Sequence, residues 1–408
     1  MNYGCDCSFV IHVSKSGNDS NGGVAQQYPV NLANDSKLTI GSALSACPDG
    51  GTIVIWPGTY TEQVDLQAAA KAVNLIGTQR EKCIISQNTV NPVVLLYAGS
   101  RMESLRVEQS GSGMVVNGSQ QDNCQVINCS VVGGDAAIDG LYFSGADKIV
   151  VKDCYIKAAY DALYITKETL VENCIVITNG LASGSGIARA VAVGSSPDYV
   201  IIRNSIIIAK PSYEKKTGKF AELYQSDRDL YCIHNGGEVI LENCMLLADG
   251  YRPTGAHAES YSNGHSSCTY GMSRLVAKNC IFKAWTDQNV ADRVAYGITA
   301  GSASLINSII NTSAQGSGGT AWDIQCAATS TVYLVNTRYD SSKVHSNVTL
   351  HALPDDTDRL NRAAKTLLNK AVQAKTTGAI DYYDDDGQTV ILTHTPTDGE
   401  SAITRVPN

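Results

Sequence analysis

Two aspartates stand in similar surroundings and have the chemistry needed to cleave a sugar polymer. Asp139 begins the phrase Asp-Gly-Leu, and Asp161 begins the phrase Asp-Ala-Leu. Two carboxyl groups cleave a glycosidic bond when one donates a proton and the other acts as base or nucleophile. A second arrangement that could cleave the polymer is a carboxylate-bound cation together with a basic residue such as Lys167 or Arg189. The alternative is structural, with each aspartate accepting a hydrogen bond from a turn amide.

Other catalytic and metal-binding patterns do not accompany this pair. The histidines form no HxxH or HExxH pattern, so we interpret His234, His257 and His265 as hydrogen-bonding loop residues. The sequence has no Gly-rich phosphate loop and no nucleophile elbow. The acidic run 384–386 precedes Gly387 and lacks the carboxylate spacing of an EF-hand, so it indicates a turn. We therefore expect no metal and no cofactor.

A repeated phrase indicates the scaffold that positions the aspartates. Asn followed by Cys or Ser recurs inside runs of β-branched residues at intervals of about 20 to 40 residues, which is typical of a solenoid. The repeated positions are Asn128-Cys129, Asp153-Cys154, Asn173-Cys174, Asn204-Ser205, Asn243-Cys244, Asn279-Cys280, Asn307-Ser308 and Asn336-Thr337. Spacings of about one coil, with no CxxC partner and no nearby His, disfavour a metal or redox site here.

Each copy of the phrase has the alternating pattern of a β-strand. One such strand cannot bury its apolar side alone, whereas strands of successive coils stack and pair their backbone groups. The repeated Asn suits a turn with a left-handed backbone, which Asn tolerates. The repeated Cys is predicted to point inward as a small hydrophobic residue. If the coils are in register, Asp139 and Asp161 lie near each other on one face.

A phrase near the start of the chain resembles a known family. Residues 51–62 read Gly-Thr-Ile-Val-Ile-Trp-Pro-Gly-Thr-Tyr-Thr-Glu, with Ile76-Gly77 after them and the lead-in 13–19 before them. They resemble the opening coils of right-handed parallel β-helices of the pectate-lyase and pectin-methylesterase type. The resemblance covers about residues 8–340. It implies the fold rather than one activity, because lyases, esterases, hydrolases, epimerases and viral tail spikes share this opening.

The two aspartates also resemble catalytic elements of one group with this fold. Asp139 and Asp161 are similar to the Asn-Thr-Asp-Gly-Ile and Asp-Asp-Cys elements of polygalacturonases. One Asp replaces that group's Asp pair, and the group's Gly-His-Gly and Arg-Ile-Lys elements do not occur in the expected places. The resemblance implies that Asp139 and Asp161 are candidate catalytic residues, without the groups that position the sugar ring.

We predict an all-β fold, a right-handed parallel β-helix solenoid with an N-terminal cap and a small α+β C-terminal module. Residues 1–50 form the N-terminal segment, in which 40–46 is a short capping helix. Residues 51–345 form the β-helix. Residues 354–408 form the C-terminal module, which we interpret as a docking or oligomerising tail similar to small segments on phage-type structural proteins.

Within the C-terminal module, the apolar spacing predicts one helix and several strands. The helix spans 359–372. A hairpin over 379–392 turns at Asp386-Gly387, and a final strand lies near 401–405.

From residue 179 onward the coils carry long insertions that fall at one point of the repeat. They cover 179–189, 210–229, 249–273 and 285–293, and insertions in phase project from one side of a solenoid. We interpret their surface as the recognition face, with shielding loops or a subunit contact as the alternative. The residues expected to bind carbohydrate are Tyr213, Tyr224, Tyr251, Arg252, Tyr261, Tyr270 and Trp285, with Lys215, Lys216, His257 and His265 beside them.

Composition limits the partners. A net charge of −8 and a pI near 5.4 argue against nucleic acid. Twenty Tyr against four Phe favour aromatic surface that stacks on pyranose rings, or else half-exposed strand packing. No apolar run reaches membrane-spanning length. The start lacks the pattern of a secretory signal, so we expect synthesis in the cytoplasm, with incorporation into a virion, or secretion if the sequence is trimmed.

Two functions remain open at this stage. The first is a non-enzymatic structural or adhesion protein of a phage-like virion, tail-spike-like, which recognises a surface polysaccharide or a virion partner through the Tyr-rich loops. The second is a polysaccharide lyase or glycoside hydrolase that acts on an acidic polymer with Asp139 and Asp161. The incomplete catalytic set favours the first. A homotrimer is expected by analogy with coiled spikes.

Overall fold

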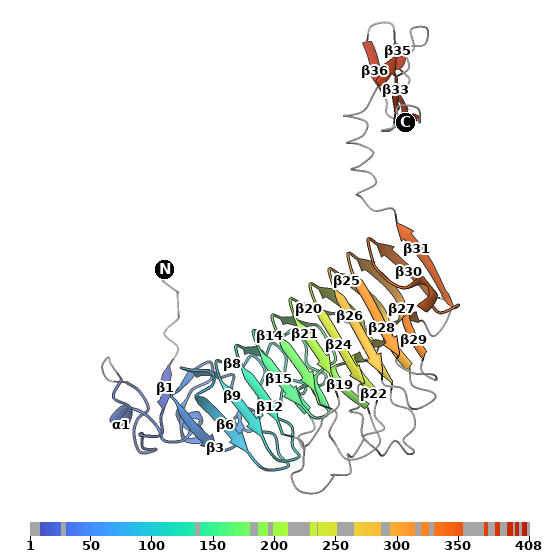
Figure 1. Cartoon of the computed structure of the whole chain (residues 1–408). Helices are drawn as coiled ribbons and strands as arrows, with labels where there is room; N and C mark the ends of the chain where they lie inside the picture. The colour runs from blue at the N-terminus through green and yellow to red at the C-terminus, as the bar shows by residue number, and fades with distance from the viewer. Residues whose placement is uncertain are drawn as a thin grey trace, which may run out of the picture. The chain divides into compact units, whose positions relative to one another are not determined.

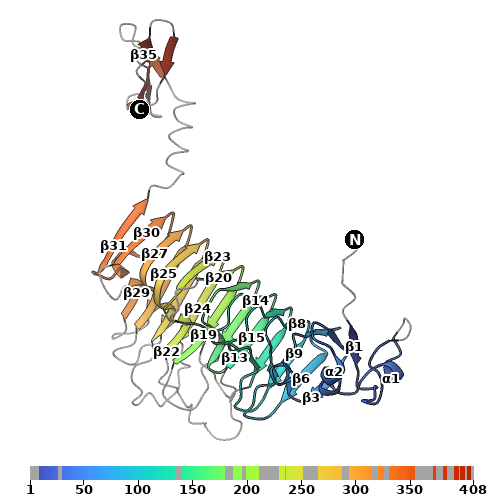
Figure 2. The same ribbon diagram turned by 180° about the vertical axis from the view of Figure 1, so that it is seen from behind.

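The computed structural model describes a long stack of short strands followed by a smaller unit (Figure 1, Figure 2). The chain divides into two compact units, Met1–His351 and Ala352–Asn408. The described residues are 9–25, 30–134, 139–179, 187–194, 199–210, 229–234, 236–250, 265–286, 294–314, 320–325, 330–353, 371–373, 380–383, 390–394, 396–399 and 402–405.

Each complete coil of the first unit contains three short strands. In one coil these are β13 (Asp139–Phe143), β14 (Ile149–Lys152) and β15 (Tyr155–Ala158). Each strand pairs in parallel with its equivalent in the next coil, so that residues at equivalent positions form rows along the stack. The stack therefore has three parallel sheets, which we call the first, second and third sheets in chain order.

The first sheet contains β4 (Val64–Asp65), β7 (Val94–Leu95), β10 (Val116–Asn117), β13, β16 (Asp161–Ile165), β19 (Ile187–Val193), β22 (Asp229–His234) and β29 (Thr320–Gln325). The second contains β1 (Val10–Val13), β2 (Thr52–Ile55), β5 (Asn74–Gly77), β8 (Arg101–Glu103), β11 (Gln125–Ile127), β14, β17 (Thr169–Glu172), β20 (Tyr199–Arg203), β23 (Glu238–Glu242) and β30 (Ser330–Val335). The third contains β3 (Gly58–Thr61), β6 (Cys83–Gln87), β9 (Arg106–Gln109), β12 (Ser130–Gly133), β15, β18 (Ile175–Thr178), β21 (Ile206–Ala209), β24 (Met245–Gly250), β26 (Ile281–Thr286) and β28 (Ile309–Ala314).

Two long strands join the first and second sheets. β25 (Ser266–Lys278) and β27 (Val294–Ile306) each run through both sheets, which together with β31 (Val348–Leu353) form one 21-stranded ladder. The third sheet stays separate with ten strands. Strands also begin or end inside all four insertions that the sequence indicated, at 187–189, 229, 249–250, 266–273 and 285–286, so the insertions are shorter than predicted.

The core lies inside the stack, where alternate residues of the three sheets meet. Side chains at the inward positions of the third sheet are apolar and buried, and they pack in one cluster with inward residues of the first sheet. These third-sheet residues are Val131, Ile156, Val176, Ile207, Leu246, Phe282 and Ile310. Each fully buried aliphatic or aromatic side chain stabilises the fold by about 1.5–3 kcal/mol, so the repeated pattern supplies stability in every coil.

The repeated Asn turns between the second and third sheets as predicted. Asn173, Asn243 and Asn279 have φ values of 54°, 54° and 55°, in the left-handed region, and the other repeat positions match them. Their side chains also form a ladder along the stack. Asn279 Nδ2 donates to Asn243 Oδ1 at 3.0 Å, and Asn243 Nδ2 donates to Asn204 Oδ1 at 3.0 Å. Asn thus suits both the backbone and the contact between coils.

The residue after each Asn points inward and is buried, which confirms the prediction for Cys129, Cys154, Cys174, Cys244 and Cys280. The structure adds a polar role that the sequence did not indicate. The Cys129 backbone N–H donates to Cys154 Sγ at 3.4 Å, and the Cys280 backbone N–H donates to Ser308 Oγ at 3.2 Å. A small side chain with an acceptor atom therefore accepts a hydrogen bond from a buried backbone N–H of the preceding coil. Either Cys or Ser can do this, which explains why both occur at this position.

A short helix covers the start of the stack. α2 (Ile40–Ala46) begins after Thr39, whose side chain accepts a hydrogen bond from the Ser42 backbone N–H. Glu62 also accepts hydrogen bonds from the backbone N–H groups of Ile40 and Gly41. Ile40, Ala43 and Leu44 of α2 join the core. The other helices among the described residues are α1 (Leu32–Asp35), α3 (Leu66–Ala69) and the 3₁₀ helix η1 (Ser341–Lys343).

The parallel ladder starts earlier than the sequence indicated. β1 pairs with β2 from Val10 to Val13, so the first strand of the stack lies inside the expected N-terminal segment 1–50. Among the described residues, no helix has the length and apolar character to cross a membrane.

The second unit contains antiparallel strands. β32 (Ala371–Gln373), β33 (Ile380–Tyr383) and β34 (Val390–His394) form one sheet, and β35 (Pro396–Gly399) pairs with β36 (Ala402–Arg405). The strands of the predicted hairpin and the final strand are present. The helix prediction is wrong at 371 and 372, which pair with β33 instead. The apolar spacing at 371 and 372 also fits a short strand. The rest of the predicted helix, 359–370, lies outside the described residues.

Candidate functional site

The two candidate aspartates lie side by side in the first sheet. Asp139 begins β13 and Asp161 begins β16, and the two are paired residues in these parallel strands. Neighbouring strands are about 4.8 Å apart, so the two carboxyl groups are close. Both side chains are almost fully buried, with Asp139 4% exposed and Asp161 2% exposed.

Arg189 occupies the next position in the same row. It pairs with Asp161 across β16 and β19, and its guanidinium binds the carboxylate through two hydrogen bonds. Nε donates to Oδ1 at 2.7 Å and Nη2 donates to Oδ2 at 2.6 Å. The Tyr160 ring lies 5.5 Å from the guanidinium carbon. Of the two basic residues that the sequence suggested, Arg189 is therefore placed at the pair, whereas Lys167 lies in the turn after β16.

Burial controls the charge of both carboxyl groups. Together with the nearby charge of Asp161, it raises the pKa of Asp139 to about 7. Burial also raises the pKa of Asp161 to about 6, although the Arg189 guanidinium opposes this shift. Among the residues that the structure describes, Asp139 Oδ1 has no hydrogen-bond partner. Between about pH 6 and pH 7 the row therefore holds a proton on Asp139 beside an ion pair between Asp161 and Arg189.

This arrangement contains an acid and a base, but it does not present both to solvent. A protonated carboxyl beside an ionised one is the combination that glycosidases use. Asp161, however, already has its charge matched by a bidentate guanidinium, which is the geometry of a structural ion pair. Asp139 keeps one unpaired oxygen, so it is the member of the pair with unused hydrogen-bonding capacity.

An outer row of aromatic residues runs along the same sheet, three residues further along each strand. The residues at this position in successive coils are Tyr142, Tyr164, Ala192, His234 and Tyr270. The rings of Tyr142 and Tyr164 are stacked, with centroids 4.6 Å apart, and those of His234 and Tyr270 are stacked at 5.6 Å. We call these four aromatic residues the aromatic row. The sequence signal for its first half is the spacing Asp-x-x-Tyr, repeated at 139–142 and 161–164, which the sequence analysis missed.

A buried tyrosine supports the second half of the aromatic row. The Tyr231 ring lies 4.5 Å from His234 and 4.9 Å from Tyr270 between centroids. Its hydroxyl donates to Asp229 Oδ2 at 2.8 Å, and Asp229 Oδ1 accepts a hydrogen bond from the His265 backbone N–H at 2.8 Å. Burial and the charge of Arg189 together lower the pKa of His234 to about 4. His234 is therefore a neutral ring at physiological pH, suited to stacking.

The residues expected to bind carbohydrate fall into two groups. Tyr213, Tyr224, Tyr251, Arg252 and Tyr261 lie outside the described residues, as do Lys215, Lys216 and His257. Tyr270 belongs to the aromatic row of the first sheet, whereas Trp285 lies near the end of β26 in the third sheet. The two therefore lie on different sheets.

The comparisons with known proteins concern the fold. No protein-family model matches the chain, and no curated protein matches it. Among solved structures, pectate lyase Pel9A matches with a TM-score of 0.50 and 11% identity, covering 83% of this chain and 82% of that chain. Pectin methylesterase PemA from Erwinia chrysanthemi matches at a TM-score of 0.41 and 15% identity over 68% and 79%. Pectin methylesterase from carrot matches at 0.40 and 14% over 86% and 89%.

The fold is the right-handed parallel β-helix of pectate-lyase-like proteins. This confirms the prediction from the repeated phrase and the opening coils. The low identities limit the comparison to the fold, so the activity of the β-helix has to be argued from its own residues.

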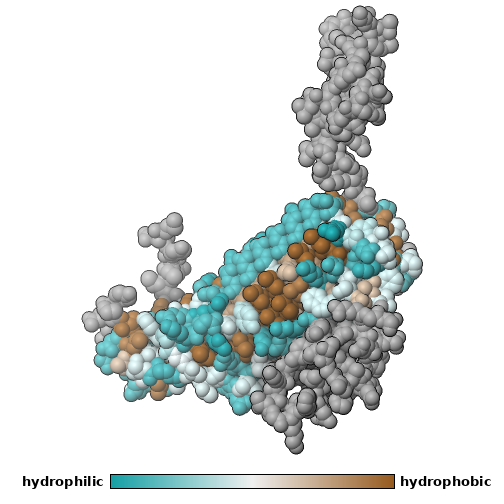
Figure 3. All heavy atoms as spheres, viewed as in Figure 1, coloured by the Kyte–Doolittle hydropathy of each residue, from teal (hydrophilic) through white to brown (hydrophobic). Residues whose placement is uncertain are grey.

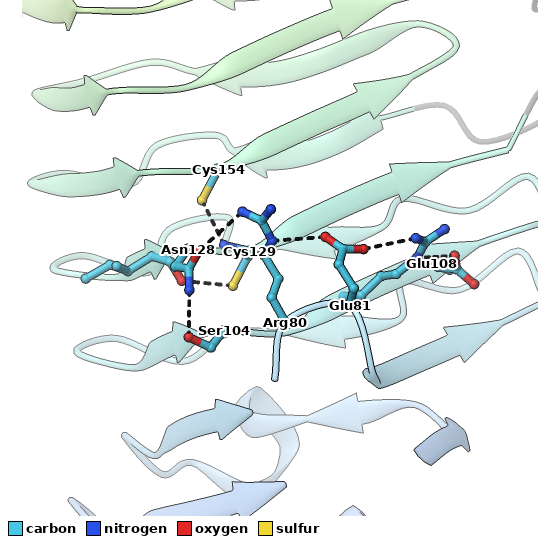
Figure 4. Close-up of polar contacts among 9 residues, drawn as sticks. Arg80, Glu81, Ser104, Glu108, Asn128, Cys129 and Cys154 are labelled. Atoms are coloured by element: carbon cyan, nitrogen blue, oxygen red, sulfur yellow. Dashed lines mark hydrogen bonds and ion pairs between the residues drawn. The ribbon is translucent and has the colours of Figure 1, made fainter. Parts of the chain in front are cut away.

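The third sheet of the β-helix has a groove on its outer surface, near the turns that carry the Asn ladder (Figure 4). Its volume is about 590 Å³. Along one side, Arg80 Nη1 donates to Asn128 Oδ1 at 3.2 Å, and Glu81 forms ion pairs with Arg80 at 2.9 Å and with Arg106 at 3.0 Å. The remaining side includes Tyr155 and Ile175. Because the side chains of Arg80, Glu81 and Arg106 are partly exposed, their ion pairs contribute little stability.

Proposed function

We propose that this β-helix is a non-enzymatic structural or adhesion protein that binds a polysaccharide along the aromatic row of the first sheet. The observation that carries the proposal is the pair of ring stacks, Tyr142 with Tyr164 and His234 with Tyr270, on one outer row. Aromatic rings offer flat apolar surface to a pyranose, and the tyrosine hydroxyls add hydrogen bonds. Strand spacing places Tyr164 and His234 about 10 Å apart, so an extended chain of sugars can contact both stacks.

The burial of Asp139 and Asp161 supports a binding role over catalysis. Both carboxyl groups are nearly inaccessible, and Asp161 is held by Arg189. A role on a virion-like particle fits the separate C-terminal unit of antiparallel strands, which is unlike the β-helix. That setting is part of the proposal.

Binding is tested with a panel of acidic and neutral polysaccharides, by affinity electrophoresis or calorimetry on the full chain. Tyr164→Ala is expected to weaken binding about tenfold, the equivalent of about 1.4 kcal/mol for the loss of one stacking ring. Tyr333→Ala is the matched control, because Tyr333 is an exposed tyrosine of the second sheet, in β30. Equal affinity of Tyr164→Ala and the wild type for every bound polymer would reject the aromatic row as the binding site.

A polysaccharide lyase or glycoside hydrolase is the second candidate, and one observation favours it. Asp139 has an unpaired buried oxygen and a pKa of about 7, which is the state of a general acid. The same polymers are incubated with the protein and assayed for reducing ends and unsaturated products. Product release that disappears in Asp139→Asn, with polymer binding retained, would replace the non-enzymatic proposal.

A further inference from the structure

The outer side of the third sheet carries a continuous set of apolar side chains. At the first outward position of each strand from β15 to β28, the residues are Tyr155, Ile175, Ile206, Met245, Ile281 and Ile309. At the second outward position they are Lys157, Ile177, Ile208, Leu247, Lys283 and Asn311. The nine apolar members of these two rows form what we call the isoleucine patch.

The isoleucine patch is unusually exposed for its composition. Ile175 is 40% exposed, Ile206 is 38% exposed and Ile309 is 40% exposed. Figure 3 shows hydrophobic surface gathered over the middle strands of this sheet. With strands about 4.8 Å apart and outward residues about 6.6 Å apart, the twelve residues of the two rows cover about 380 Å², and the nine apolar ones cover about 285 Å² of it. That apolar area is close to the lower end of the range for the largest apolar patch on a typical monomer, about 300–600 Å², and such patches often mark interaction sites.

The shape and chemistry of the patch fit a second copy of this chain. The strands that carry it pair without a register shift, so its side chains form two regular rows, and the end of the patch at Tyr155 and Ile175 borders the groove described above. A regular apolar row on one copy can pack against the same row on a second copy, which is the condition for contact between equal subunits. The core of a stable interface is apolar and its rim is polar, and about 800 Å² is buried on each partner. The patch is large enough for such a core, with Lys157, Lys283 and Asn311 at its rim.

The two lysines also select the orientation. Lys157 and Lys283 stand at opposite ends of the second row, in β15 and β26. In an antiparallel arrangement of two copies centred on β21, β15 of one lies over β26 of the other, which brings Lys157 of one copy together with Lys283 of the other. Such like-charge contacts are unfavourable. In a parallel arrangement around an axis along the first row, both lysines point away from the axis toward solvent.

We propose that copies of this chain associate through the isoleucine patch, with their solenoid axes parallel and the row from Tyr155 to Ile309 at the centre of the contact. The aromatic row lies on the first sheet, so this contact leaves the proposed polysaccharide surface uncovered. The two proposals therefore use different residues and can fail independently.

Sedimentation velocity on the full chain over a concentration series tests the association. The wild type is expected to be oligomeric, and Ile206→Asp at the centre of the patch is expected to raise the dissociation constant at least 100-fold. Val90→Asp is the matched control, because Val90 is a 75% exposed apolar residue outside the patch, and it should leave the oligomer unchanged. Ile206→Thr keeps a β-branched side chain and should weaken association less than Ile206→Asp while preserving the circular dichroism spectrum.

Orientation is tested with a single Ile309→Cys substitution and a short bismaleimide crosslinker. The parallel arrangement places the two introduced thiols together at the axis, so a crosslinked dimer is expected above the wild-type background. In the antiparallel arrangement the two thiols are far apart and no additional dimer forms. A wild type that is monomeric at all concentrations, or an oligomer that folded Ile206→Asp leaves intact, would overturn the proposal and assign the patch to another partner.

Discussion

Asp139→Asn is expected to stabilise the β-helix strongly at pH 8 and less at pH 5. An aspartate in an unfolded chain has a pKa of about 3.9, whereas burial and the charge of Asp161 raise the pKa of Asp139 to about 7. The folded state thus binds this proton more tightly than the unfolded state. The free energy of unfolding therefore falls as the pH rises from about 4 to about 7.

The size of this effect follows from the two pKa values. The difference between about 3.9 and about 7 corresponds to about 4 kcal/mol of stability that is lost by pH 8. Asn is close in size to Asp and carries no charge, so it removes the pH-dependent penalty. Because the measured cost of buried groups varies by factors of two to three, a gain of about 2 kcal/mol or more at pH 8 agrees with this reasoning.

Asp161→Asn is the matched control, and it is expected to act in the opposite direction. It leaves the Arg189 guanidinium, whose side chain is 16% exposed, without its carboxylate. Removing one partner of such a buried ion pair destabilises a protein by about 3–5 kcal/mol. At pH 8, Asp139→Asn should therefore stabilise the protein, whereas Asp161→Asn should destabilise it.

The assay is urea unfolding of both variants and the wild type from pH 5 to pH 9, followed by circular dichroism. If unfolding is irreversible, the unfolding rate in a fixed urea concentration replaces the midpoint. The reasoning is refuted if Asp139→Asn retains the pH dependence of the wild type, or if it destabilises at pH 8 as strongly as Asp161→Asn.

Three further predictions concern the scaffold. Asn279→Ala should lower the free energy of unfolding by about 2 kcal/mol, because Ala is strained in a left-handed backbone and cannot form the ladder hydrogen bonds. Asn279→Gly should lower the free energy of unfolding by less in the same urea assay, and equal decreases for the two variants would contradict the backbone explanation. Phe282→Ala should cost about 3–5 kcal/mol, since the ring is fully buried, and a shift in urea midpoint no larger than that of Tyr333→Ala would count against the core assignment. The buried ladder thiols Cys154 and Cys174 should react with a thiol reagent only after unfolding, because side-chain hydrogen bonds with neighbouring cysteines, together with burial, raise the pKa of both thiols. Peptide mapping that finds Cys154 or Cys174 labelled in the native protein would disagree.

The ladder could be predicted from the sequence because its two requirements are local. A left-handed turn selects Asn, and an inward position beside a strand selects a small residue, so both repeat with the coil. The capping helix 40–46 was predicted with its observed bounds, since its apolar positions and the preceding Thr39 are also local signals.

The candidate site was harder to predict because it depends on how strands of different coils align. The alignment of Asp139 with Asp161 followed from their similar sequence phrases. Arg189 follows a predicted insertion, and the length of that insertion does not show which residue of the next strand aligns with Asp161. His234 and Tyr270 were missed as a pair for the same reason. They become neighbours only through the parallel register of β22 and β25.

The insertions also hid where strands begin. The segment 266–273 is rich in Ser, Cys, Thr and Gly and has no clear alternation, so its composition suggested a loop. In the structure it pairs with β22 and β27, because a strand on each side satisfies its backbone groups regardless of side-chain pattern. Tertiary pairing decided the conformation where local preference was weak.

The left-handed turn makes successive coils of the β-helix structurally equivalent at their junctions. Asp153 and Asn173 have the same backbone conformation and occupy the same corner of adjacent coils. Excising 153–172 would join Lys152 directly to Asn173 and leave Asn128 and Asn173 as immediate neighbours in the stack. The polypeptide can thus be shortened by a complete winding without creating a new kind of junction, and natural or engineered length variants of this scaffold would differ by such whole windings.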